Sequence, residues 1–133
     1  MTVAYDLLII AGQDLTNATF RWKINDAPVD LTSFKARAHI RRALDVEEDP
    51  TVIFTTENGG IVLGGVTGTI EMLMDAVASA ALWSDDLPAS PTSYKGRRCY
   101  DLGYWDIEIL NAINEPIERL LQGRVAICPE ATR

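Results

Sequence analysis

The chain of 133 residues has the length of a single domain, residues 1–133, and a formal net charge of −7. A chain of this length can bury a hydrophobic core without disulfides or metal ions to stabilise it. The negative net charge argues against nonspecific binding to nucleic acid or to an anionic membrane. No basic region precedes the first apolar run, which is too short to span a bilayer, so we expect no signal peptide, no membrane span and synthesis in the cytoplasm.

The first apolar run has hydrophobic residues of both parities, at Leu7, Leu8, Ile9 and Ile10. One buried strand face needs only every second residue to be apolar. The run therefore predicts either a strand covered on both faces within the domain or, over residues 1–12, a strand that joins the sheet of a neighbouring subunit.

Two strands with a period of two follow, over residues 20–24 and 34–41. Their apolar positions predict one buried face each, and the residues between them point outward. The only histidine, His39, shares this outward parity, which favours a solvated strand residue over a catalytic one. If the two strands pair, their outward cations form a basic stripe, which is interpreted first as a solvated sheet face and alternatively as a docking surface for an acidic neighbour, which includes another copy of the chain. These cations are Arg21, Lys23, Lys35, Arg37 and Arg41.

The middle of the chain alternates short apolar segments with turns. The acidic run Asp45, Glu47, Glu48 and Asp49 lacks the spacing of a calcium loop and is interpreted as solvated. Short strands follow near residues 52–54 and 69–74. Alanine-rich residues 75–83 predict the one helix, with Asp75 among its candidate caps. Proline, glycine and serine make residues 87–98 a predicted long loop.

The C-terminal part predicts a β-hairpin of two long strands joined by a turn at residues 111–116. Pairing core positions with core positions sets Trp105 opposite Gly123, and Ile107 opposite Leu121. In that register Cys99 and Cys128 fall on opposite faces, so we expect two free thiols unless a bulge intervenes.

Short strands separated by turns, with one short helix, indicate an all-β fold, an antiparallel β-sandwich. No side-chain set predicts catalysis, a cofactor site or a metal site. Asp106 and Glu108 are two outward residues of one strand, and the glycine pairs Gly59-Gly60 and Gly64-Gly65 lack the lysine of a phosphate loop. We therefore expect a protein that is not an enzyme.

Three passages resemble a family of small structural proteins of tailed bacteriophages. They are similar to the N-terminal domain of phage baseplate upper proteins. The passages are PVDLTSFKARAHIR at residues 28–41, FTTENGGIVLGG with GTI at residues 54–70, and YDL, WDIEI and ERLLQGRVAICPEATR within residues 100–133. The resemblance implies an immunoglobulin-like β-sandwich and a place in the virion.

The expected function is a multi-copy adaptor in the tail, baseplate or neck, because the chain ends at Arg133 without a fibre domain. The expected partners are other virion proteins and further copies of the chain, with no nucleic acid and no membrane. Two alternatives stay open: a capsid decoration or head-fibre anchor, and a non-virion module that binds peptide or carbohydrate. Such a module needs exposed aromatic residues, for which only Trp83, Tyr94 and Tyr100 qualify. The candidate interface consists of Leu7, Leu8, Ile9, Ile10, Arg21, Lys23, Lys35, Arg37, Arg41 and Tyr94.

Overall fold

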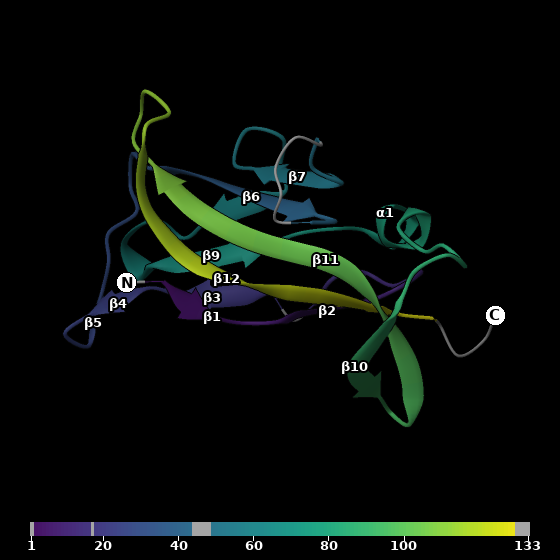
Figure 1. Cartoon of the computed structure of the whole chain (residues 1–133). Helices are drawn as coiled ribbons and strands as arrows, with labels where there is room; N and C mark the ends of the chain where they lie inside the picture. The colour runs from purple at the N-terminus through teal and green to yellow at the C-terminus, as the bar shows by residue number, and fades with distance from the viewer. Residues whose placement is uncertain (1, 17, 44–48, 130–133) are drawn as a thin grey trace.

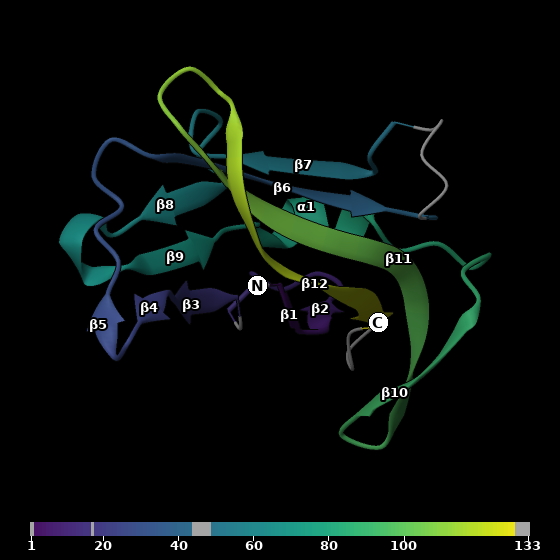
Figure 2. The same ribbon diagram turned by 60° about the vertical axis from the view of Figure 1, so that its left-hand side comes forward.

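A computed structural model describes residues 2–16, 18–43 and 49–129 and shows an all-β, sandwich-like fold (Figure 1). The predicted fold class is confirmed. A large sheet packs against a three-stranded sheet, and the long curved strands β11 and β12 run through the whole molecule (Figures 1 and 2).

The large sheet has the strand order β1-β12-β11-β6-β7. Strand β2 pairs in parallel with β12 on the same edge as β1, and β10 pairs with the start of β11. The strands are β1 (Val3–Ala4), β2 (Leu7–Ile10), β6 (Lys35–Arg41), β7 (Val52–Thr55), β10 (Ala89–Tyr94), β11 (Arg97–Leu110) and β12 (Pro116–Cys128).

The small sheet is antiparallel with the order β3-β9-β8, and a separate two-stranded ribbon joins β4 to β5. Two short helical segments complete the described part. The elements are β3 (Thr19–Arg21), β4 (Lys23–Ile24), β5 (Ala27–Pro28), β8 (Ile61–Leu63), β9 (Thr69–Met72), the 3-10 helix η1 (Gly65–Thr67) and α1 (Ala76–Ala81).

The main core lies between the two sheets. Residues of β6 alternate between buried and half-buried, as their two-residue period predicts. The apolar residues of β6 and β11 face those of β8 and β9. The most enclosed of them include Ala38, Ile40, Ile107, Ile109, Ile61, Ile70 and Met72.

Helix α1 is capped and anchored as its sequence suggests. The carboxylate of Asp75 accepts a hydrogen bond from the Ala78 amide at 2.8 Å, which confirms the predicted N-cap. The fully buried Ser79 hydroxyl accepts from the Gly12 amide at 3.0 Å and donates to the Gln13 carbonyl at 2.7 Å. These bonds tie the short helix to the turn after β2.

Two predicted segments differ in the structure. Residues 20–24 are not one strand, because the chain passes from β3 to β4 at Trp22, whose amide donates to the Gly68 carbonyl. Residues 87–98 are not a loop. They contain β10 and its turn into β11, in which Lys95 (φ 50°) and Gly96 (φ 78°) both have positive φ, as tight hairpin turns require. Of the acidic run, Asp49 is exposed, and Asp45, Glu47 and Glu48 lie outside the described residues.

The prediction of free cysteines is wrong, because Cys99 and Cys128 form a disulfide. The predicted register is correct from Trp105 opposite Gly123 to Ile107 opposite Leu121. A bulge then adds Leu102 to β11, since Asp101 pairs with Ala126 and Gly103 with Val125. The extra residue reverses the parity of β11 beyond it and places Cys99 on the face that Cys128 occupies.

Candidate interaction surfaces

The outer face of the large sheet carries charges of both signs in register. Arg37 lies opposite Glu108, and Glu108 lies opposite Arg119. Arg37 and Glu108 form an ion pair at 3.7 Å, and Arg119 reaches Asp106 at 3.4 Å. Because cations and carboxylates face each other across the strands, this face is not a uniformly positive surface.

Arg124 extends the same charged face toward the bulge. Its guanidinium pairs with Asp101, donates to the Tyr104 hydroxyl at 3.1 Å, and lies 4.8 Å from the Tyr104 ring centroid. The pKa of Arg124 is raised, first by the charge of Asp101 and then by Tyr104. The side chain is thereby fixed in the sheet surface.

His39 lies half-buried in a shallow hollow of about 320 Å³ on this face. Its Nδ1 is 3.5 Å from Nη2 of Arg41. Burial and the Arg41 charge lower the pKa of His39, against the opposing effect of Asp106. The environment favours neutral imidazole, and the arrangement matches a structural member of a charged sheet face better than the solvated residue that was predicted.

The predicted basic stripe does not form. Its condition was pairing between the strands that carry Arg21 and Arg37, but β3 belongs to the small sheet and β6 to the large one. Lys35 pairs with Glu57 at 3.2 Å, so part of the β6 charge is already matched. Arg21 and Lys23 are exposed and lie on β3 and β4, neither of which pairs with β6.

The N-terminal run lies inside this domain and does not offer a free strand. Leu7 and Ile9 are each 1% exposed and belong to the main core. Leu8 and Ile10 pack on the other face, against the disulfide. The apolar residues of both parities thus reflect two covered faces in one chain, which was the first of the two predictions. Leu7 and Ile9 are therefore not available as surface contacts of the folded domain, which corrects their place in the candidate interface, whereas the interface prediction for half-buried Leu8 and Ile10 stays a prediction.

The aromatic candidates also have local partners. Tyr94 is half-buried against the small cluster of Cys99, Ala126 and Cys128, and the Lys95 ammonium lies 5.3 Å from the Tyr94 ring centroid. Trp83 and Tyr100 contact each other with centroids 5.0 Å apart. These three residues do not form a flat exposed platform.

A groove that the sequence did not indicate opens between the sheets. It has a volume of about 430 Å³ and lies where β3 of the small sheet approaches β12 of the large one. Exposed Arg21 and Lys23 stand at its rim. Among the described residues neither cation takes part in an ion pair. The apolar lining consists of Val3, Phe20, Trp22, Ile70, Ile107, Leu120 and Leu121.

The turn between β11 and β12 projects from one end of the molecule (Figures 1 and 2). The Asn111 carboxamide oxygen accepts hydrogen bonds from the amides of Ile113 and Glu115, at 3.0 and 2.9 Å. The backbone N–H of Asn111 in turn donates to the backbone carbonyl of Glu115 at 3.0 Å. At its apex Ile113 is 72% exposed.

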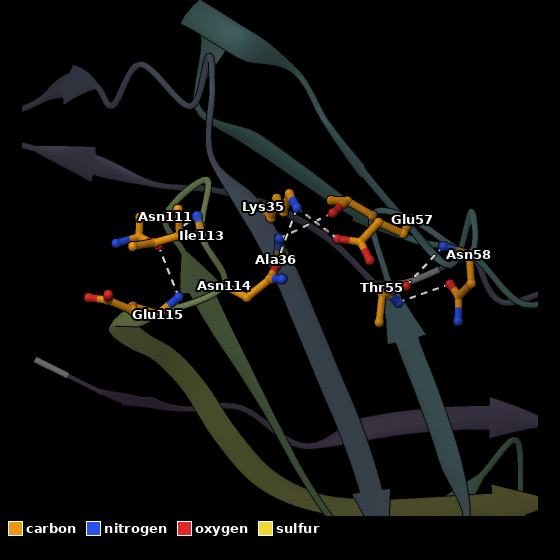
Figure 3. Close-up of polar contacts among 10 residues, drawn as sticks. Lys35, Ala36, Thr55, Glu57, Asn58, Asn111, Ile113, Asn114 and Glu115 are labelled. Carbon is orange, nitrogen blue, oxygen red and sulfur yellow. Dashed lines mark hydrogen bonds and ion pairs between the residues drawn. The ribbon is translucent and has the colours of Figure 1, made fainter.

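Lys35 fixes this turn to the neighbouring strands (Figure 3). Its ammonium donates to Oδ1 of Asn114 at 3.3 Å and pairs with Glu57 at 3.2 Å. Next to Glu57, Thr55 and Asn58 exchange two hydrogen bonds of 2.9 Å. The sequence located the turn, but the contact with Lys35, 79 residues away, needed the fold.

Within the described ranges, no three histidine, cysteine, aspartate or glutamate side chains are grouped to hold a metal ion. No helix of the described part has the length and hydrophobicity of a bilayer span.

No family model matches this chain, and no curated protein matches it. The resemblance to the N-terminal domain of phage baseplate upper proteins therefore stays an expectation, resting on the residues that carry it.

Proposed function

We propose that this chain is a multi-copy structural subunit of a tailed-phage particle, an adaptor in its tail, baseplate or neck region. The resemblance motivates the proposal. Its passages supply β8 of the small sheet together with β6 and most of β11 and β12, which are the internal strands of the large sheet.

The observation that carries the proposal is that one domain has two apolar features exposed for contact. One is the hydrogen-bonded turn with Ile113 at its apex, and the other is the groove rimmed by Arg21 and Lys23. Preorganised apolar features of this kind suit docking to another protein, because little conformational entropy is lost on binding.

The disulfide is compatible with a particle that is assembled in the host cytoplasm and then released into oxidising surroundings. Disulfides persist in oxidising surroundings and are rare in cytosolic proteins. A subunit made in the host cytoplasm with two reduced cysteines would form the Cys99–Cys128 bond after release.

The test is quantitative mass spectrometry of purified virions, with the copy number measured against the major capsid protein. We expect several copies per particle, in a number that fits a ring. Antibody labelling in electron micrographs then separates a tail position from a capsid decoration or a head-fibre anchor. Absence from particles, together with normal particles when the gene is deleted, refutes the proposal and favours a free binding module.

A further inference from the structure

The groove and the projecting turn have complementary chemistry. The groove offers an apolar interior, and at its rim stand Arg21 and Lys23, which form no ion pair with any residue that the structure describes. The turn offers Ile113, 72% exposed, and two residues later Glu115, an exposed carboxylate. Opposite charges around a buried aliphatic contact fix the orientation of a docked segment.

The turn of one copy does not fill its own groove. Lys35 holds the turn toward β6, on one side of β11. The groove lies at β12 and β1, on the other side of β11. The complementary partner for each feature is therefore on a second molecule.

We propose that the β11–β12 turn of one copy inserts Ile113 into the groove between β3 and β12 of a second copy, with Glu115 facing Arg21 and Lys23. The contact is heterologous, because each copy uses one feature as donor and the other as acceptor. Head-to-tail contacts of this type close into rings or continue as filaments. The inference deepens the proposed function by naming the surfaces through which copies meet, but its test needs no virion.

The volume of the groove, about 430 Å³, lies within the range of about 300–1,000 Å³ found for small-ligand pockets, so it is large enough for the Ile113 side chain. A single turn in a groove buries much less than the roughly 1,600 Å² of a standard stable interface. The contact is accordingly weak between two free copies and is strengthened by repetition in a ring.

The experiment is sedimentation velocity of the full chain at physiological salt, from about 10 μM to about 1 mM. We expect concentration-dependent association of the wild type. Ile113→Asp should weaken it by roughly tenfold or more, since it removes the buried aliphatic group and places a charge in the groove. The matched control is Val66→Asp, a change at a similarly exposed position (69%) on η1, which should leave association unchanged. A wild type that stays monomeric throughout the range overturns the proposal, as does equal loss in both variants.

Charge reversal gives a second, sharper test. Glu115→Lys alone and Arg21→Glu with Lys23→Glu should each abolish self-association. A mixture of the two variants should associate again, because the lysine turn of one meets the acidic rim of the other. The control Lys95→Glu with Arg97→Glu changes the net charge by as much as the double variant at Arg21 and Lys23, but at exposed positions of the β10–β11 hairpin. Failure of the mixture to associate, or loss in the control, refutes the pairing of turn and groove. Particles that contain the chain in many copies together with a negative result here would leave the proposed function standing and remove only this interface.

Discussion

His39 makes the stability of the protein depend on pH. Partial burial and the neighbouring Arg41 lower the pKa of His39 below its usual value of 6.5, whereas Asp106 and Glu108 act in the opposite direction. Between the lowered folded pKa and 6.5, the unfolded chain holds more protons than the folded one, so the free energy of unfolding falls as the pH falls through this window.

Replacing His39 by Gln should remove that dependence. We expect urea titrations between about pH 7.5 and about pH 5 to show wild type losing stability relative to His39→Gln as the pH falls, and the difference between the two to be constant above the unfolded pKa. A difference between the two proteins that stays constant over this range would show that folding leaves the pKa of His39 unchanged.

The Cys99–Cys128 disulfide is a covalent cross-link that restricts the unfolded chain. It closes a segment of 29 residues and lies under Leu8, Ile10 and Tyr94. A loop of that size removes enough entropy from the unfolded chain to stabilise the folded state by about 3.6 kcal/mol. Cys99→Ser with Cys128→Ser should lower the free energy of unfolding by that amount, measured by urea titration. Alkylation of the unfolded, unreduced wild type is the independent check: two reactive thiols would contradict the bond.

At the scale of elements, the N-terminal segment and β12 approach so closely that only glycine fits at residue 123. A Cβ there would lie 2.1 Å from the Tyr5 carbonyl oxygen. The same carbonyl accepts a hydrogen bond from Nε1 of Trp105 at 2.7 Å, so it is not free to move. Gly123→Ala should therefore destabilise the fold by about 2 kcal/mol or more through forced displacement of this segment.

The matched variant is Gly96→Ala, at the tip of the β10–β11 hairpin. A Cβ there meets nothing within 4 Å, and only the positive φ of 78° opposes it. The expected cost is about 1 kcal/mol. Thermal melting of the two variants compares steric overlap with backbone strain. Equal effects would mean that the approach of Tyr5 to Gly123 is easily relaxed.

Strand β2 carries the edge of the large sheet and should be needed for folding. Ile9→Ala empties a position in the main core and is expected to cost about 2–4 kcal/mol. Val3→Ala, on the exposed strand β1, should cost less than about 1 kcal/mol. Urea midpoints measure both. A folded, stable protein after removal of residues 1–11 would contradict this role and restore the alternative of an exchanged strand.

Local patterns predicted the elements whose residues interact with near neighbours in the sequence. The alternation of β6, the Asp75 cap and the pairing of Trp105 with Gly123 all follow from such patterns. The disulfide needed one more fact, the bulge at Leu102. The signal available in the sequence was the adjacent Gly103, a glycine inside a predicted strand. In the structure Gly103 has φ 129° and leaves no room for a Cβ beside the Arg41 carbonyl.

Long-range contacts limited what the sequence indicated about the interaction surfaces. Arg21 and Arg37 lie on strands with equal alternation, but nothing local states that β3 pairs with β9 instead of β6. The groove combines Phe20 with Leu121, and the turn depends on Lys35 meeting Asn114. Both features exist only once the two sheets are assembled, so a pattern of neighbouring residues could not show them.

At the scale of the whole molecule, stability should be graded from the centre of the large sheet outward. The part of β11 over residues 104–110 pairs with β12 on one side and with β6 on the other, and its inner residues lie in the main core. The β4–β5 ribbon has only two paired positions, and its residues are exposed. Backbone amides open with free energies that follow such differences in pairing and burial.

Hydrogen exchange followed by mass spectrometry should therefore find the slowest exchange in peptides covering residues 104–110. Intermediate exchange is expected for β9, which is central in the smaller sheet, and the fastest for residues 23–28. Reduction of the disulfide should speed exchange in β2 and at the start of β11 more than in residues 104–110, because the bond joins β11 to β12 next to β2. Uniform acceleration over all strands would instead show that the two ends of the sheet open as one cooperative unit.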